Sequence, residues 1–178
     1  MKNVLIITTS PRIGGNSDKL ARQFALGARE AGNNVEVISL ADEQIQFCKG
    51  CLSCVTTLRC FMHDDTDAIR AKMREADVIV WATPVYYYSI SGQMKTMIDR
   101  ANPLYGDDYK FRDIYFLATA AEDEPETVSG AQTAVQGWID CFEKAKLKGV
   151  VFAGGVTRKD DIDGHPSLEK AYAMGEQV

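Results

Sequence analysis

The sequence has no apolar run that approaches the roughly 20 residues needed to cross a membrane as a helix. The apolar stretch near its start, residues 4–7, is too short for a secretory signal peptide, and no small-residue cleavage site follows it. These absences predict a cytoplasmic protein that does not engage a membrane.

Basic charge is also lacking, because 20 Lys and Arg stand against 25 Asp and Glu, which gives a net charge of −5. A nucleic-acid-binding surface needs a basic face, so we expect no nucleic-acid partner. His63 and His165 are the only histidines and are isolated in the sequence. We expect both to be structural or surface residues rather than general acids.

No internal repeat, low-complexity tract or domain boundary interrupts the chain. With 178 residues, 46% of them hydrophobic, the chain is large enough to bury one packed core. The Pro-, Gly- and Asp-rich stretch at 154–166 is interpreted as a connection within that domain. We therefore expect a single domain over residues 1–178.

Five short apolar runs alternate with segments in which apolar residues recur every three or four positions. Alternating strands and helices with right-handed crossovers predict an α/β fold, a doubly wound five-stranded parallel sheet of strand order 2-1-3-4-5. The predicted strands cover residues 4–7, 35–40, 78–82, 114–118 and 150–153. The predicted helices contain apolar positions within 20–28, 69–76, 94–101, 128–142 and 168–172. Residues 41–63 are predicted to form a long loop with a short extended piece at 45–47.

The loop after the first strand reads Ser-Pro-Arg-Ile-Gly-Gly-Asn-Ser at residues 10–17. Free backbone N–H groups at a helix start, together with the helix dipole, favour an anion. Ser10, Asn16 and Ser17 can donate from their side chains, and Arg12 adds a charge-assisted donor. Walker A and G-x-G-x-x-G spacings are both absent. The loop therefore predicts a phosphate site of another type, and the alternative is an ordinary strand–helix turn with Ser17 as the N-cap.

An aromatic segment follows the third strand, where Pro84 and Val85 precede Tyr86, Tyr87 and Tyr88. Pro84 ends the strand, because proline lacks an N–H and restricts the residue before it. The tyrosines can pack along a planar aromatic ligand while their hydroxyls stay in water. The alternatives are that they cover the core or a partner subunit.

Four cysteines lie within thirteen residues in the pattern Cys48-x2-Cys51-x2-Cys54-x5-Cys60. In a reducing compartment such a group indicates thiols or metal ligands rather than disulfides. Four thiolates can hold a [4Fe–4S] cluster or zinc, and free or redox-active thiols are the third alternative. Cys141 stands apart in the predicted helix at 128–142, and we expect it to be a packing residue.

The motifs S-P-R-x-G-G-N-S, P-V-Y-Y, S-G-Q-M-K-T-M-I-D-R and G-H-P-S-L-E-K-A occur in this order along nearly the whole chain. In them the sequence resembles the NADPH-dependent FMN reductase and iron–sulfur flavoprotein branch of the flavodoxin-like superfamily. The resemblance implies that the Ser10–Ser17 loop binds the FMN phosphate. It further implies that the isoalloxazine ring lies against residues 84–88, and that a loop beginning with Thr119 and Ala120 closes one side.

The resemblance implies an FMN-dependent NAD(P)H oxidoreductase that passes electrons through the flavin to a small acceptor of the quinone, nitro or azo type. The flavin carries this chemistry, so no catalytic side chain is predicted. The alternative is an iron–sulfur flavoprotein-like electron carrier, with a [4Fe–4S] cluster on the Cys48–Cys60 loop and a redox protein as its partner. A homodimer or homotetramer is expected, and the sequence leaves open the choice between NADH and NADPH.

Overall fold

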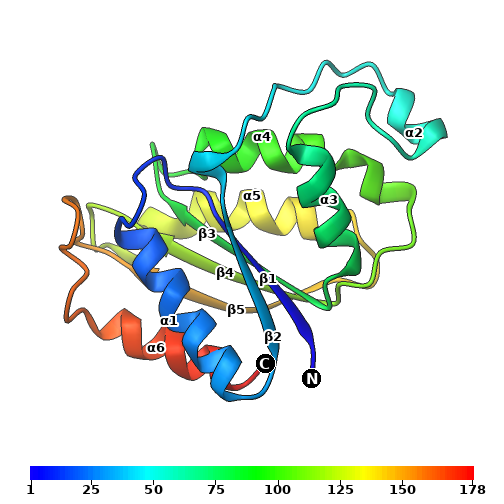
Figure 1. The fold of residues 1–178 in the computed structure, drawn as a ribbon. Coiled ribbons are helices and arrows are strands. Elements are labelled where there is room, and N and C mark those ends of the chain that lie inside the picture. Colours follow the sequence, from blue (N-terminus) through cyan, green and yellow to red (C-terminus); the bar gives the residue numbers. More distant parts are fainter.

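A computed structural model describes residues 1–178 and contains one five-stranded sheet (Figure 1). Neighbouring strands are parallel throughout, and their order is β2-β1-β3-β4-β5. The predicted sheet and strand order are therefore confirmed. The strands are β1 (Asn3–Thr8), β2 (Asn34–Ser39), β3 (Val78–Pro84), β4 (Asp113–Thr119) and β5 (Lys146–Ala153).

Helices cover both faces of the sheet (Figure 1). One face carries α1 (Asn16–Glu30) and α6 (Pro166–Glu176), and the other carries α3 (Thr66–Glu75), α4 (Gly92–Arg100) and α5 (Ser129–Ile139). The short helix α2 (Ser53–Thr57) lies in a loop that extends away from the sheet. Three 3-10 turns complete the elements, η1 (Leu40–Asp42), η2 (Asn102–Gly106) and η3 (Pro125–Val128).

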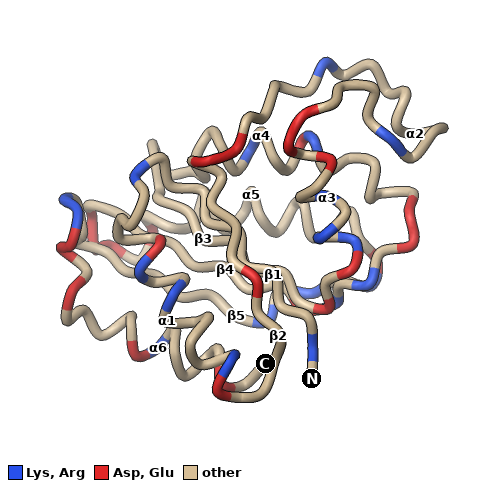
Figure 2. The backbone as a smooth tube through the Cα atoms, viewed as in Figure 1, with Lys and Arg blue, Asp and Glu red and all other residues tan.

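None of these helices combines the length and the apolar character that crossing a membrane requires. Along the backbone tube of Figure 2, Lys and Arg residues alternate with Asp and Glu residues in the helices and loops.

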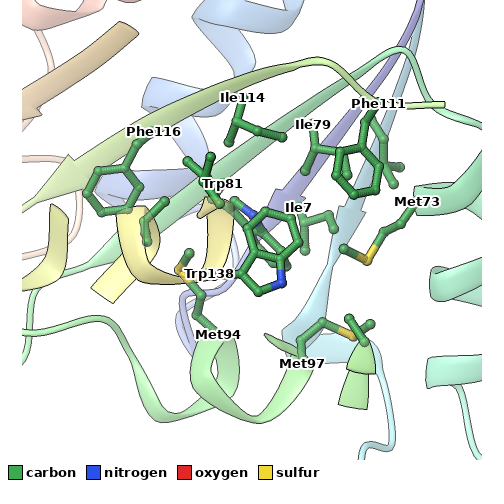
Figure 3. Packing of buried hydrophobic residues seen from close by; sticks show 14 of the residues in the cluster. Ile7, Met73, Ile79, Trp81, Met94, Met97, Phe111, Ile114, Phe116 and Trp138 are labelled. Carbon is green, nitrogen blue, oxygen red and sulfur yellow. The ribbon is translucent and has the colours of Figure 1, made fainter. Parts of the chain in front are cut away.

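Two apolar clusters bury the two faces of the sheet, and the larger one lies under α3, α4 and α5 (Figure 3). In it Trp81 of β3 meets Trp138 of α5 edge to face, with ring centroids 5.6 Å apart and planes at 86°. Phe111 stacks beside Trp138 at 5.9 Å, and Met94 and Met97 of α4 cover the tryptophans from the helix side. Each such side chain contributes about 1.5–3 kcal/mol by leaving water, which fixes α4 and α5 on this face.

The structure differs from the sequence-based expectation in two places. Residues 45–47 form no strand, and α2 occupies residues that were predicted to be loop. Strand β5 begins at Lys146 rather than at residue 150. It is an edge strand whose outer positions are exposed, so Lys146 and Lys148 interrupt the apolar run that marked the other strands.

A buried ion pair attaches the long loop before α3 to the end of α4. The side chain of Arg100 is 0% exposed, and its guanidinium donates to both carboxylate oxygens of Asp64 at 2.6 and 3.0 Å. It also donates to the carbonyl oxygens of Gln46 (2.7 Å) and Met62 (3.3 Å), which flank the cysteine segment on both sides. Arg100 therefore holds both ends of the segment at 47–61 against the helix.

Asp64 should make the stability of the protein depend on pH. Burial alone raises the pKa of Asp64, but hydrogen bonds from Arg100 and Thr66 outweigh it and hold that pKa well below its ordinary value. A carboxylate with a lowered pKa stabilises the fold above the unfolded-state pKa of about 3.9, and this contribution is lost as pH falls towards the folded-state pKa. We expect Asp64→Asn to lower the free energy of unfolding at neutral pH by about 3 kcal/mol. We expect the difference from wild type to narrow below about pH 4 in urea unfolding measured across pH.

Asp99→Asn is the matched control, because Asp99 forms an exposed pair with Lys95 along the surface of α4. Its effect should stay below about 1 kcal/mol at every pH. Parallel pH profiles for wild type and Asp64→Asn would contradict the role given to the buried pair.

Candidate functional site

The loops that follow β1, β3 and β4 meet at the carboxyl edge of the sheet. The Ser91 hydroxyl, which caps α4, lies 2.9 Å from the Thr9 hydroxyl beyond β1. The Val85 N–H donates to the Thr119 carbonyl oxygen at 2.8 Å, which joins the ends of β3 and β4. Because the strand order reverses between β1 and β3, this is the edge at which doubly wound sheets bind their ligands.

Helix α1 begins without a side-chain cap. Its N-cap is Gly15 in an extended conformation, so the alternative that Ser17 caps the helix is wrong. The N–H groups of Asn16, Ser17 and Asp18 donate to no protein acceptor. Three adjacent free donors at the positive end of a fifteen-residue helix dipole form a site for an anion.

The two serines predicted to face a phosphate are buried and already paired. The Ser10 hydroxyl accepts the N–H of Arg12 at 3.1 Å and so fixes the turn after β1. The Ser17 hydroxyl lies 2.7 Å from the Thr119 hydroxyl, in a hydrogen bond that either oxygen can donate. Ser17 therefore links the start of α1 to the end of β4, and Ser10 shapes the loop.

The two other predicted phosphate ligands contact a segment that the sequence analysis treated only as a connection. Arg12 Nη1 donates to the carbonyl oxygen of Thr157 at 2.9 Å, and Asn16 Nδ2 donates to that of Arg158 at 2.8 Å. Both acceptors lie in the loop between β5 and α6. That loop follows β5 and so lies at the same carboxyl edge of the sheet. Its place after a predicted strand is the feature of the sequence that could have marked it as part of the site.

Asp18 adds a negative charge inside the same loop. It is 6% exposed, and its Oδ2 accepts the N–H of Gly14 at 2.6 Å. Its Oδ1 is buried without a protein partner, as is Oδ1 of Asn16. An anion bound by the free N–H groups would therefore be repelled by the carboxylate of Asp18. Positive charge near the anion would offset this repulsion.

The three tyrosines form a tight turn that projects from the sheet edge. Tyr86 and Ser89 exchange two backbone hydrogen bonds of 3.0 and 3.1 Å, and the residues between them lie in the left-handed region, at φ 48° for Tyr87 and 60° for Tyr88. Such a conformation costs about 1–2 kcal/mol for each non-glycine residue. The tyrosines are 40%, 101% and 55% exposed in chain order, so the alternative that they cover the core is wrong.

Contacts on one side of the turn hold it in this strained form. The Tyr88 hydroxyl donates to Glu122 beyond β4 at 2.9 Å, and this hydrogen bond raises the pKa of Tyr88. The carbonyl oxygen of Tyr88 lies against Gly130 of α5, where a Cβ would stand only 2.2 Å away. Pro84 and Val85 lead into the turn and Ala120 follows β4, with Pro84 and Ala120 buried and Val85 half-buried.

All four clustered cysteines line one cavity of about 630 Å³ between their loop, the end of α4, η2 and α5. Cys48 and Cys51 are exposed, whereas Cys54 and Cys60 are half-buried. A hydrogen bond with Ser53 lowers the pKa of Cys51. The donors have the number and kind that a [4Fe–4S] cluster needs, but no three of them converge in a geometry that could hold a metal ion.

The remaining cysteine and the two histidines have other surroundings. Cys141 is exposed at the rim of the same cavity, so the expectation that it packs in the core is wrong. His63 pairs with Asp67 at 3.1 Å, and His165 caps α6 by accepting the N–H of Ser167. Both histidines are structural or surface residues, as the sequence predicted.

The sequence pattern of one family, NADPH-dependent FMN reductase, matches residues 2–153. An iron–sulfur flavoprotein of Methanosarcina thermophila is 36% identical, over 94% of this chain and 85% of that protein. One from Archaeoglobus fulgidus is 33% identical, over 97% of this chain and 76% of that protein. A third, from Methanocaldococcus jannaschii, is 42% identical over 57% of this chain, and the match spans about half of that protein.

Solved structures with the same fold include an NAD(P)H:quinone oxidoreductase from Methanothermobacter marburgensis, with a TM-score of 0.77 and 19% identity. That match covers 99% of this chain and 95% of the other. An azoreductase from Bacillus anthracis matches with a TM-score of 0.75 and 19% identity over the full length of both chains. At this identity the likeness shows the fold, which is flavodoxin-like.

The contact between the tyrosine turn and α5 makes Gly130 sensitive to substitution. In Gly130→Ala the new methyl group would overlap the carbonyl oxygen of Tyr88, so the turn or the helix must shift. We expect the variant to lose about 1–3 kcal/mol of stability in thermal unfolding. We also expect chymotrypsin to cleave faster at the exposed tyrosines.

Gly137→Ala is the matched control in the same helix, because no atom lies within 4 Å of the position that its new methyl group would occupy. Alanine favours an exposed helix by up to about 1 kcal/mol over glycine, so this variant should be as stable as wild type or more stable. Equal melting temperatures and equal cleavage for the two variants would contradict the packing of the turn on α5.

Proposed function

The chain belongs to the NADPH-dependent FMN reductase family, and we propose that it passes electrons from NAD(P)H through FMN to a small quinone, nitro or azo acceptor. Membership of this family makes it an NAD(P)H-dependent FMN oxidoreductase. The type of acceptor, the residues that hold FMN and the assembly of the protein are the parts that we propose.

The observation that carries the proposal is the uncapped start of α1. The free N–H groups of Asn16, Ser17 and Asp18 can bind the FMN phosphate without any change in the loop. Arg12 lies in the same loop and adds positive charge, although one of its nitrogens is held by Thr157. In this arrangement the backbone binds the phosphate, while the side chains of Ser10 and Ser17 fix the shape of the loop.

The isoalloxazine ring is assigned to the space beside the tyrosine turn. Pro84, Val85 and the tyrosines would form one wall, and the segment that begins with Thr119 and Ala120 would form the other. Exposed tyrosine rings cover a flat aromatic ligand well, because their faces are apolar and their hydroxyls stay in water. The bond from Tyr88 to Glu122 joins the two walls at their rim.

When bound, FMN supplies hydride acceptance and electron donation. The chain contributes binding, orientation and electrostatic stabilisation. Backbone N–H groups near the ends of β3 and β4 can stabilise negative charge on the reduced ring, because they are fixed by the sheet before the reaction. We assign no catalytic side chain, since the flavin carries the chemistry and both histidines have structural partners, Asp67 and the N–H of Ser167.

A cytoplasmic homodimer or homotetramer is also proposed. All five cysteines are free, which fits a reducing compartment. The open tyrosine turn and the exposed apolar side chains of the cysteine loop, Phe47, Leu52, Val55 and Phe61, offer surface that a second subunit could cover.

Placing a negative charge at the phosphate site should remove the flavin. In Ser17→Asp the carboxylate competes for the free N–H groups and repels the phosphate. We expect the variant to remain folded, to purify without FMN absorbance, and to oxidise neither NADH nor NADPH. The ratio of flavin to protein absorbance and the rate of nicotinamide oxidation measure both effects.

Ser129→Asp is the control, because it places the same charge at the exposed start of α5 and should leave FMN content unchanged. Stoichiometric FMN in Ser17→Asp would contradict the assigned phosphate loop. Failure of the FMN-loaded wild type to oxidise either nicotinamide with quinone, nitro and azo acceptors would contradict the proposed acceptors.

A second function, electron transfer through a [4Fe–4S] cluster, is favoured by one observation. Cys48, Cys51, Cys54 and Cys60 are drawn from one loop and line one cavity. Relatives at 33% and 36% identity are named iron–sulfur flavoproteins, which is consistent with this alternative. Ligation requires the four thiols to converge, and exposed Cys48 and Cys51 on either side of Gly50 leave the loop room to do so.

Anaerobic purification followed by iron and sulfide analysis separates this alternative from free thiols. A cluster gives about four irons per chain and a broad visible shoulder, and Cys54→Ser should lower the iron content. Cys141→Ser is the control outside the loop and should leave iron unchanged. Flavin bands without iron would contradict the electron-carrier alternative and leave the reductase.

A further inference from the structure

The loop between β5 and α6, residues 154–165, contacts the proposed phosphate loop, residues 10–17, and carries a basic pair followed by acidic residues (Figure 2). Two side chains of the phosphate loop attach to it, since Arg12 donates to the Thr157 carbonyl at 2.9 Å and Asn16 to the Arg158 carbonyl at 2.8 Å. These bonds fix the carbonyl groups of the two residues that precede Lys159. The position of the next side chain is therefore set relative to the start of α1.

Each aspartate of this loop has a partner in an ion pair or a hydrogen bond. Asp160 and Asp163 pair with Lys19 of α1 at 2.8 and 2.5 Å. Asp161 accepts the N–H groups of Thr157 and Arg158 at 3.0 and 2.6 Å, which closes the turn. Each carboxylate of the loop therefore has a partner, although Asp160 and Asp163 share the single ammonium group of Lys19.

The two basic residues of this loop, Arg158 and Lys159, have no such partners. The side chains of Arg158 and Lys159 form no hydrogen bond and no ion pair with the protein. Lys159 Nζ lies 3.7 Å from the point at which Gly14 would carry a Cβ. Gly14 has φ +69° and no side chain, so the ammonium group can approach the phosphate loop closely at this residue.

The charge of the phosphate loop explains why a second cation is needed there. Asp18 is buried beside the free N–H groups, and Arg12 is partly held by Thr157. A phosphate monoester brings about two further negative charges, which a single partly engaged guanidinium compensates poorly near a carboxylate. Lys159 forms no hydrogen bond or ion pair, and its Nζ lies beside Gly14 of this loop, although its charge also acts on the neighbouring Asp160.

We propose that Lys159 binds a phosphate monoester at the start of α1, and that this group is the 5′-phosphate of FMN. The inference rests on the proposed function, because it assigns a ligand to the same phosphate site. The 2′-phosphate of NADPH is the other monoester in the reaction, and the experiment separates the two.

The test compares FMN with riboflavin, which has the same ring and no phosphate. Protein stripped of flavin is titrated with each, and binding is followed by the quenching of flavin fluorescence. Lys159→Gln should weaken FMN binding about fivefold at about 0.05 M salt and leave riboflavin binding unchanged. The loss should shrink at about 0.5 M salt, where charges are screened, and Lys159→Arg should restore binding.

Lys170→Gln is the matched control, because Lys170 is exposed on α6 and makes no ion pair. Equal FMN affinity in Lys159→Gln and wild type would overturn the proposal, as would an equal loss for FMN and riboflavin. A rise in KM for NADPH but not for NADH, with FMN affinity unchanged, would assign the cation to the nicotinamide cofactor and overturn the FMN assignment. If wild-type protein binds no FMN, the proposed function fails instead.

Discussion

The parallel pairing of β1 with both β2 and β3 determines where everything else in this protein lies. Because the chain leaves β1 in one direction along the sheet and later returns to its other side, the strand order reverses at β1, and doubly wound sheets bind their ligands at the carboxyl edge beside this reversal. The Ser91 hydroxyl lies 2.9 Å from the Thr9 hydroxyl and joins the loops after β3 and β1 at this edge. The uncapped start of α1 follows β1 and the strained tyrosine turn follows β3, so this strand order brings both to the same edge.

Helix α4 connects the carboxyl edge of the sheet to the loop that carries the four clustered cysteines. Its first turn is capped by Ser91 at the carboxyl edge of the sheet, and its last residue, Arg100, holds both ends of the cysteine loop. Nine residues of helix extend about 13 Å, so a rigid element of that length separates the two attachments. The methionines on its inner face pack into the larger core, which prevents the helix from sliding. The cysteine loop is thus anchored to the same helix that begins at the carboxyl edge of the sheet.

Much of the fold was readable from local sequence, and particular residues show why. Buried strands such as 78–82 gave continuous apolar runs because both faces are covered, and Pro166 marked the start of α6 because its missing N–H is unused there. The predicted β5 was too short, because an edge strand exposes alternate positions to water and its first residues therefore form no continuous apolar run. Helix α2 was missed because its five residues have no buried face, and so no periodic pattern.

The sequence by itself determined the strand order, the loops that follow β1 and β3 and the grouping of four cysteines. Each of these depends on residues close together in the chain, through local propensity, spacing and the handedness of crossovers. Only the tertiary structure decided that Arg100 and Asp64 form a buried pair, that Tyr88 rests on Gly130, and that Lys159 lies beside Gly14. These contacts join residues 36, 42 and 145 positions apart, and no local pattern specifies them. They arise when the packed sheet brings distant loops to one edge, where the partners are selected by burial and charge.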